Sequence, residues 1–147
     1  DKPLVGVSTL EALAENFRYT DQLICPLLDA RRGQVYTGLY RFEDKNARSS
    51  VILEDVALGL EDLLAKVEEY GDNVIFCGQG AQRFKDPITR RIGDRAIIPS
   101  GSSSVVRGSQ VAHIGLGIIR RSEVIDDAFT IKPSYLRRSD AEIRAGR

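Results

Sequence analysis

Two short segments combine residues that could contact a phosphate group. In Asp29-Ala30-Arg31-Arg32-Gly33, two arginines precede a glycine at an expected turn, and Gly78-Gln79-Gly80-Ala81 follows an apolar run. Glycine lets a backbone approach a ligand, a helix N-terminus favours anions, and the arginine fork suits phosphate. The competing interpretation is an ordinary tight turn, which uses the same glycines. The segments predict a nucleotide cleft for ATP or ADP that is formed by Asp29, Arg31, Arg32, Gly78, Gly80 and Ala81.

Residues for catalysis or metal binding are scarce. A zinc site needs three or four Cys, His or carboxylate ligands, whereas the sequence has one histidine, His113, and two separated cysteines. A nuclease of the ribonuclease-H type needs converging carboxylates for divalent metal, and the expected first strand offers only Asp29. Neither a nucleophile elbow nor a P-loop is present. We therefore predict no catalytic residue and no metal site.

Composition and charge are those of an ordinary globular domain. The 147 residues are 42% hydrophobic, and 21 basic side chains balance 21 acidic ones, so net charge gives no general reason to bind nucleic acid. Neither a membrane-spanning run nor a signal peptide is expected. Cys25 and Cys77 lie in apolar runs, which favours buried thiols in a reducing cytoplasm. A nucleic-acid-binding module remains an alternative because of four arginine pairs: Arg31-Arg32, Arg90-Arg91, Arg120-Arg121 and Arg137-Arg138.

Periodicity and turn residues predict one helix and several strands in the first half. Leu4–Val7 is expected to form a short strand whose unpaired edge would favour self-association. Ser8 and Glu11 form a capping box that predicts a helix over residues 9–17. Pro26 is an irregularity in the next strand, because a central strand needs its backbone donors. The further strands are predicted over residues 23–30, 35–42 and 50–56, with a loop over 43–49.

In the second half, helices and strands are expected to alternate. A helix over residues 60–70 should end at Gly71, and a second helix over 82–92 should be interrupted by Pro87. Short strands are predicted over 74–77 and 96–99, a tight loop over 78–81, capping serines over 100–104, a helix over 105–121 and an extended segment over 133–137. This order predicts an α/β fold with a ribonuclease-H-like mixed sheet of three antiparallel strands and then alternating helices and strands. We expect one domain over residues 1–147, with a core at 22–137 and a tail at 138–147.

Several stretches resemble the TsaB (YeaZ) family. Residues 5–14 resemble the segment that joins the two halves of these proteins, and Pro26–Tyr36 resembles their hairpin, which is the most specific match. Gly78–Ala81 and Pro133–Arg137 fit later landmarks, whereas the family's Asp-Thr-Ser strand and Gly-Pro-Gly-Ser-Phe-Thr-Gly stretch are not in the sequence. The family is glycoprotease-like and has two ribonuclease-H-like halves, as in actin, sugar kinases and heat-shock ATPases. The resemblance implies the second half of an actin-like ATPase fold, with residues 1–17 contributing a strand and connecting helix of the first half.

The same resemblance implies a supporting role in tRNA modification. Family members pair with the catalytic paralogue TsaD and the ATPase TsaE, and TsaD transfers threonylcarbamoyl to adenosine in tRNA. The expected role is a non-catalytic cytoplasmic scaffold that contacts TsaD and TsaE, meets tRNA only indirectly and is a candidate homodimer. The alternatives are a nucleotide-binding ATPase or phosphotransferase of the same superfamily and a glycoprotease-like metallopeptidase.

Overall fold

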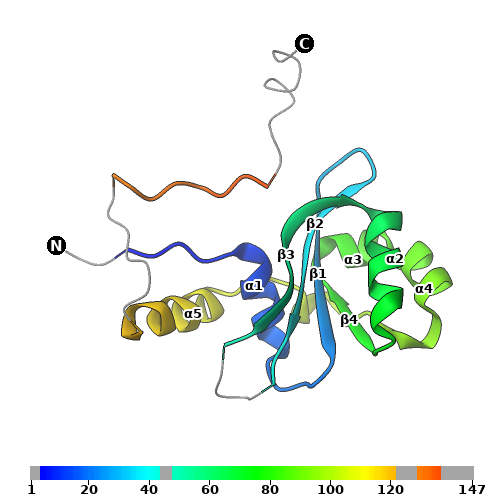
Figure 1. Ribbon diagram of the computed structural model, residues 1–147, viewed down its shortest axis with the longest axis horizontal. Helices are drawn as coiled ribbons and strands as arrows, with labels where there is room; N and C mark the ends of the chain where they lie inside the picture. The colour runs from blue at the N-terminus through cyan, green and yellow to red at the C-terminus, as the bar shows by residue number, and fades with distance from the viewer. Residues whose placement is uncertain (1–3, 44–47, 122–128, 137–147) are drawn as a thin grey trace, which may run out of the picture.

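The computed structural model describes residues 4–43, 48–121 and 129–136. Five strands form one mixed sheet in the order β3-β2-β1-β4-β5 (Figure 1). Strand β1 pairs antiparallel with β2 and β2 with β3, whereas β4 pairs parallel with β1 and β5 parallel with β4. The predicted α/β fold is confirmed. The strands are β1 (Leu23–Asp29), β2 (Gln34–Arg41), β3 (Ser50–Gly59), β4 (Val74–Cys77) and β5 (Ala96–Ile97).

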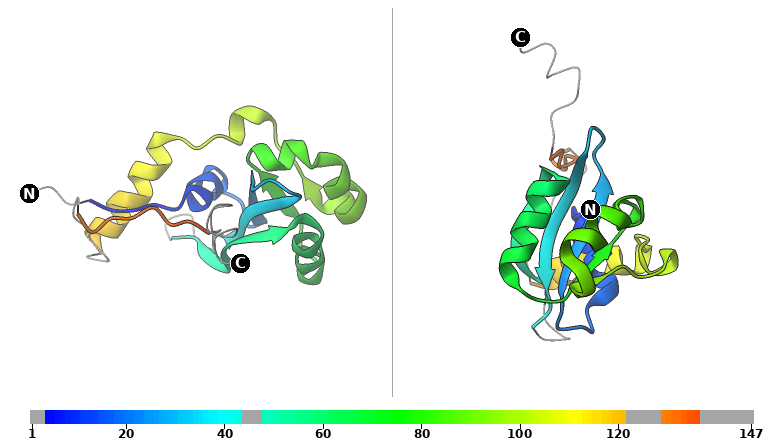
Figure 2. Two further views of the ribbon diagram at one scale, coloured as in Figure 1. Left: turned by 90° about the horizontal axis from the view of Figure 1, so that it is seen from above. Right: turned by 90° about the vertical axis from the view of Figure 1, so that its right-hand side faces the viewer.

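Helices cover both faces of the sheet because β1 and β4 bury side chains on both sides. One core contains Leu64 of α2, Ile88 of α4 and Phe76 of β4, and the other contains Leu13 of α1 and Ile24 of β1. Figure 2 shows α1, in blue, and the two green helices α2 and α4 on opposite sides of the strands. The helices are α1 (Thr9–Ala14), α2 (Leu60–Tyr70), α3 (Gln79–Arg83), α4 (Lys85–Ile92) and α5 (Gly108–Arg120), with single 3-10 turns η1 (Glu15–Phe17), η2 (Gly93–Arg95) and η3 (Gly101–Ser103).

The segment after β4 differs from the expected tight loop. Gly78 alone forms the turn, with φ 88°, and helix α3 begins at Gln79. The helical stretch then breaks at Phe84 and not at Pro87. Pro87 lies in the first turn of α4, where a helix does not need the backbone N–H that proline lacks.

Two expected boundaries near the ends of the chain are also wrong. Leu4 forms an isolated bridge, but residues 5–7 belong to no strand. Helix α5 begins at Gly108 instead of Val105, and its N-cap Arg107 makes no side-chain capping bond, so the serines at 100–104 do not cap it. Those serines lie around the turn η3 instead. The predicted tail over 138–147 lies outside the described residues.

Irregular pairing accommodates Pro26 and bends the edge strand β3. The β1–β2 pairs pass from Ile24–Tyr40 to Leu27–Thr37, so Pro26 supplies no pair to β2. In β3, two register shifts between its pairs with Thr37 and Tyr40 mark bulges. Bulges redirect side chains and protect a sheet edge from pairing with another chain. Strand β3 is therefore a poor edge for strand addition despite its length.

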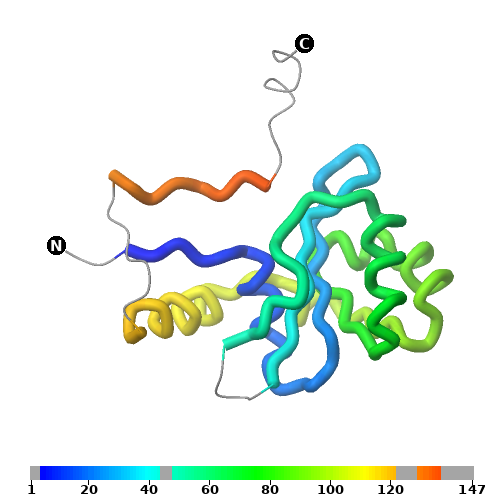
Figure 3. Tube along the Cα trace, in the orientation of Figure 1, coloured from blue at the N-terminus to red at the C-terminus, as the bar shows by residue number. Residues whose placement is uncertain are grey.

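Helix α5 and two extended segments project from the side of the sheet that carries α1. Ile114 and Ile118 of α5 pack on Ala12 of α1, and Val5 and Val7 pack on the same cluster. The trace in Figure 3 shows residues 4–8, in blue, and residues 129–136, in orange, extending beyond the sheet beside α5. These segments and α5 form a layer that lies outside the main sheet and its helices.

Candidate functional site

The turn between β1 and β2 holds its two arginines in an unfavourable backbone conformation. Arg31, Arg32 and Gly33 have φ angles of 64°, 52° and 74°. A left-handed conformation costs a non-glycine residue about 1 kcal/mol or more. The Asp29 Oδ1 atom accepts the Arg31 N–H at 2.9 Å, and the Arg31 carbonyl accepts the Gln34 N–H at 2.9 Å. These bonds hold the turn in place, and both arginine side chains are exposed.

The structure brings this turn and helix α3 together through one carboxylate. Arg83 of α3 donates from Nη1 to Asp29 Oδ2 at 2.5 Å, while Asp29 Oδ1 holds the turn. The two predicted sides of the cleft are therefore adjacent, at the carboxyl ends of the parallel strands β1 and β4. Arg83 was not predicted as a site residue, because no motif distinguishes it from the other arginines of the sequence.

The glycines of the second segment have a structural reason to be glycine. A Cβ atom on Gly78 would lie 2.5 Å from the Leu27 carbonyl oxygen, and one on Gly80 would lie 2.9 Å from the same atom. Gly78, Gly80 and Ala81 are all buried where α3 crosses β1. Their small size therefore lets α3 pack closely against β1. This packing is a sufficient reason for glycine at positions 78 and 80 without a bound ligand.

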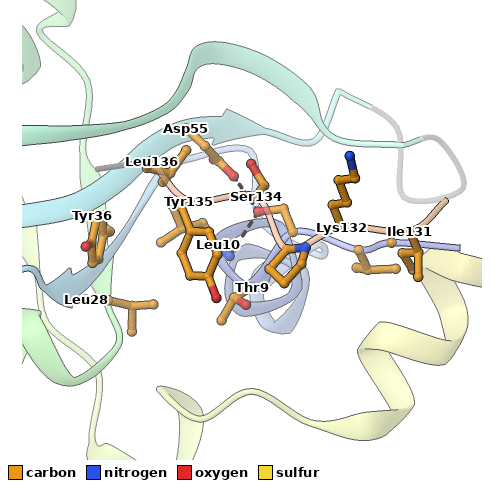
Figure 4. Close-up of a pocket in the computed structure, with 14 residues that line it drawn as sticks. Thr9, Leu10, Leu28, Tyr36, Asp55, Ile131, Lys132, Ser134, Tyr135 and Leu136 are labelled. Atoms are coloured by element: carbon orange, nitrogen blue, oxygen red, sulfur yellow. Dashed lines mark hydrogen bonds between the residues drawn. The ribbon is translucent and has the colours of Figure 1, made fainter. Parts of the chain in front are cut away.

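A separate groove lies next to the N-terminal segment. Its volume is about 920 Å³, and it runs between residues 6–10 and residues 131–136 (Figure 4). Leu28, Tyr36 and Asp55 line it from the sheet. None of the predicted nucleotide residues is among the residues that line this groove.

Asp55 joins three elements at this groove. The Ser8 hydroxyl donates to Asp55 Oδ2, and the Tyr40 hydroxyl donates to Asp55 Oδ1. Burial, and next the hydrogen bond to Asp55, raise the pKa of Tyr40 well above its usual range. A Cβ on Gly38 would lie 2.8 Å from Asp55 Oδ1, so glycine at this position leaves room for the carboxylate. Asp55 was not predicted, although a carboxylate inside the apolar run of β3 was a visible signal.

Helix α1 carries half of the predicted capping box. Ser8 Oγ accepts the Leu10 and Glu11 N–H groups at 3.1 and 3.3 Å, as expected of an N-cap. The buried Glu11 side chain instead bonds to Arg48 Nε at 3.0 Å and Ser49 Oγ at 3.2 Å. Glu11 therefore ties α1 to the segment before β3.

A second buried carboxylate lies one turn further along, at the contact with α5. Glu15 is 4% exposed, and its Oε1 atom lies 3.1 Å from Arg18 Nη1 and 3.7 Å from His113 Nε2. Burial raises the pKa of Glu15. The positive charge of Arg18 lowers this pKa, and the negative charge of Glu11 raises it. Because a guanidinium can only donate, Arg18 donates to His113 Nε2 at 2.6 Å. The single histidine thus belongs to a polar cluster with Arg18 and Glu15 that joins the end of α1 to α5.

Both cysteines are buried free thiols, as predicted. They lie in the two different cores, Cys25 on one face of the sheet and Cys77 on the other. Burial raises the pKa of the Cys25 thiol to about 12, and the hydrogen bond with the Thr37 hydroxyl acts in the opposite direction. Within the described part of the chain, no three His, Cys, Asp or Glu side chains gather as a metal site would require, and no helix could span a membrane.

Comparison with known proteins identifies the family. The model of the family described as "TsaD: tRNA N6-adenosine threonylcarbamoyltransferase" matches residues 1–145. The chain is also 35% identical, over 144 residues, to the tRNA threonylcarbamoyladenosine biosynthesis protein TsaB of Bacillus subtilis (strain 168). The chain belongs to the TsaB (YeaZ) family. It covers 60% of the Bacillus subtilis TsaB protein, and the match takes in 98% of the chain.

Solved TsaB/YeaZ structures support the fold. The chain resembles YeaZ from Pseudomonas aeruginosa with a TM-score of 0.67 and 17% identity, covering 91% of the chain and 60% of YeaZ. It resembles a Pseudomonas aeruginosa protein described as similar to peptidase YeaZ with a TM-score of 0.70 and 19% identity, covering 92% and 60%. Together with the mixed sheet, these neighbours confirm the ribonuclease-H-like, actin-like fold of the TsaB family in this chain.

Proposed function

We propose that this chain acts in the biosynthesis of threonylcarbamoyladenosine on tRNA, as a non-catalytic subunit in the cytoplasm that pairs with TsaD and works with TsaE. The observation that carries the proposal is the 35% identity to Bacillus subtilis TsaB over nearly the whole chain. The site chemistry supports a non-catalytic role. His113 is bound to Arg18, Asp29 is engaged by Arg83, and Asp55 is engaged by two hydroxyl groups.

The proposal is tested by titrating the chain into the TsaD protein of the same organism in a calorimeter. We expect saturable binding with one chain bound per TsaD. Bacillus subtilis TsaB titrated into its own TsaD is the positive control. If that control binds and this chain does not, pairing with TsaD depends on the region that the chain does not cover, and the proposed pairing is wrong for this chain.

Nucleotide binding is the second candidate, with the exposed arginines beside the ends of β1 and β4 as its support. Ligands of open α/β sheets bind at the carboxyl ends of strands, where Asp29 and Gly78 are found. A phosphotransferase would in addition need carboxylates around Mg²⁺, and Asp29 is already bound to Arg83. Titration with ADP and ATP tests this candidate, and saturation that is lost in Arg31→Asn would support it.

A further inference from the structure

A bulge in β3 gives the Asp55 carboxylate its direction. Between the β3 partners of Thr37 and Leu39, the two residues Glu54 and Asp55 lie opposite the single residue Gly38. Such a bulge bends a strand and redirects a side chain. A Cβ atom on Gly38 would lie 2.8 Å from Asp55 Oδ1, so the residue opposite the bulge also leaves the space that the carboxylate occupies. Two features of the sheet therefore combine to place one carboxylate.

The two oxygens of this carboxylate bind two different parts of the chain. Tyr40, which is 2% exposed, donates to Oδ1 from the neighbouring strand β2, so this bond fixes Asp55 within the sheet. Ser8 donates to Oδ2 from 47 residues away in the sequence, immediately before α1. Tyr40 therefore supports Asp55, whereas Ser8 is the residue that Asp55 holds.

The contact with Ser8 reaches one wall of the groove. Residues 6–10 form this wall, and Asp55 lines the groove beside them (Figure 4). The Ser8 oxygen also accepts two backbone N–H groups in the first turn of α1. The same hydroxyl therefore caps the helix and connects the wall with the sheet.

The body of α1 and the residues before Ser8 are held in different ways. In α1, Glu11 accepts the Ser49 hydroxyl at 3.2 Å, and this bond does not involve Asp55. Residues 5–7 belong to no helix or strand. Val5 and Val7 pack on α1 and α5, in a described cluster that contains no residue of the sheet. The segment before Ser8 can therefore move relative to the sheet while α1 stays in place.

We propose that the Ser8–Asp55 hydrogen bond is a latch that holds the N-terminal segment, residues 4–8, against the sheet and sets the width of the groove. When the bond is made, this wall stays beside Asp55. When the bond is broken, Tyr40 still holds Asp55 and Glu11 still holds α1, so the segment alone moves away and the groove widens. The latch is a property of the fold and does not depend on the proposed function.

Distances between two spin labels test the latch. Both native cysteines are 0% exposed, so labels attach selectively at Gly6→Cys, where a Cβ meets no atom within 4 Å, and at Lys66→Cys on the exposed side of α2. Labelled chain is diluted with unlabelled chain, so that only distances within one copy are measured. With Ser8 in place we expect one narrow distance distribution. Ser8→Asp keeps a good N-cap residue but sets a second carboxylate against Asp55, so it should shift and broaden the distribution.

Two further variants separate the latch from the cap. Adding Asp55→Asn to Ser8→Asp should restore the narrow distribution, because the introduced amide donates to the carboxylate at position 8 while its oxygen still accepts the Tyr40 hydroxyl. Ser8→Gly loses the hydroxyl but remains acceptable as an N-cap. It should broaden the distribution as well, and it gives the answer if Ser8→Asp does not fold.

The control is the label pair Lys66→Cys/Gly101→Cys, because a Cβ on Gly101 also meets no atom within 4 Å and neither site belongs to the N-terminal segment. Its distance distribution should be the same in every Ser8 variant. A purely capping role for Ser8 predicts that Ser8→Asp leaves the distance from position 6 unchanged, and that result would overturn the proposal. A broadening that Asp55→Asn does not reverse, an equal broadening of the control pair, or a broad distribution with Ser8 in place would also reject it.

Discussion

At the scale of single residues, the same side chains serve packing and the candidate site. Asp29 shows this most clearly, because one oxygen fixes the Arg31 backbone and the other holds Arg83. Gly80 shows the opposite case, since a residue predicted to approach a ligand instead approaches the Leu27 carbonyl. The glycines alone indicated where another group comes close to the backbone. They did not indicate whether that group belongs to a ligand or to another strand.

Replacing Gly80 by alanine tests this packing. The added Cβ would lie 2.9 Å from the Leu27 carbonyl carbon and oxygen, and backbone atoms cannot move away cheaply. We expect the free energy of unfolding to fall by about 1–3 kcal/mol, as for other overpacked sites. Gly101→Ala is the control, since nothing lies within 4 Å of the Cβ it would add. Urea denaturation of both variants measures the difference, and equal midpoints would mean that α3 is not seated tightly on β1.

At the scale of elements, the sequence correctly predicted the helices and strands whose ends are determined by nearby residues. Helix α2 has the predicted bounds because its apolar residues keep helical spacing and Gly71 ends it with φ 68°. Helix α5 starts later than predicted, although serines were available as caps. The bulges of β3 and the position of Asp55 could not be predicted, because they depend on pairing with β2 and on Ser8, 47 residues away. The arginine turn was predicted as a turn, but its junction with Arg83 depends on how α3 packs.

Helix α1 and the turn η1 make a pH-dependent contribution to stability through Glu15. Burial raises the pKa of Glu15 above 4.5 in the folded chain, so the folded state favours the protonated form. The stability from this group is complete below its unfolded pKa and is lost as the pH rises through its folded pKa. Glu15→Gln, which cannot ionise, should therefore gain stability relative to wild type between about pH 4 and about pH 7.

Urea unfolding of wild type and Glu15→Gln at both pH values measures this change. Glu69→Gln, which removes an exposed carboxylate from α2, gives the effect of losing one negative charge at the surface. A relative stability of Glu15→Gln that falls as the pH rises would show that pairing of the ionised Glu15 with Arg18 outweighs its burial.

At the scale of the whole molecule, the main sheet is covered by helices on both faces, whereas the layer formed by α5 and the two extended segments exposes apolar side chains. Val111 and Leu116 of α5 are 38% and 49% exposed, and Leu4 is 39% exposed. These three side chains belong to one layer of the molecule, and exposed apolar surface is where contacts with other molecules form. The strand edge β3 carries bulges, so this layer is the better candidate for association.

We therefore predict that the chain self-associates through this layer. Analytical ultracentrifugation should show a mean mass that rises with concentration, and Leu116→Glu should shift the chain towards monomer because it places a charge on the exposed side of α5. Tyr70→Glu is the matched control, since Tyr70 is 42% exposed but lies at the end of α2. A monomer at every concentration would contradict the prediction. If Leu116→Glu and Tyr70→Glu reduce the mean mass equally, the contact does not lie specifically on α5. If the mean mass still rises with concentration in both variants as in wild type, the contact lies elsewhere on the surface.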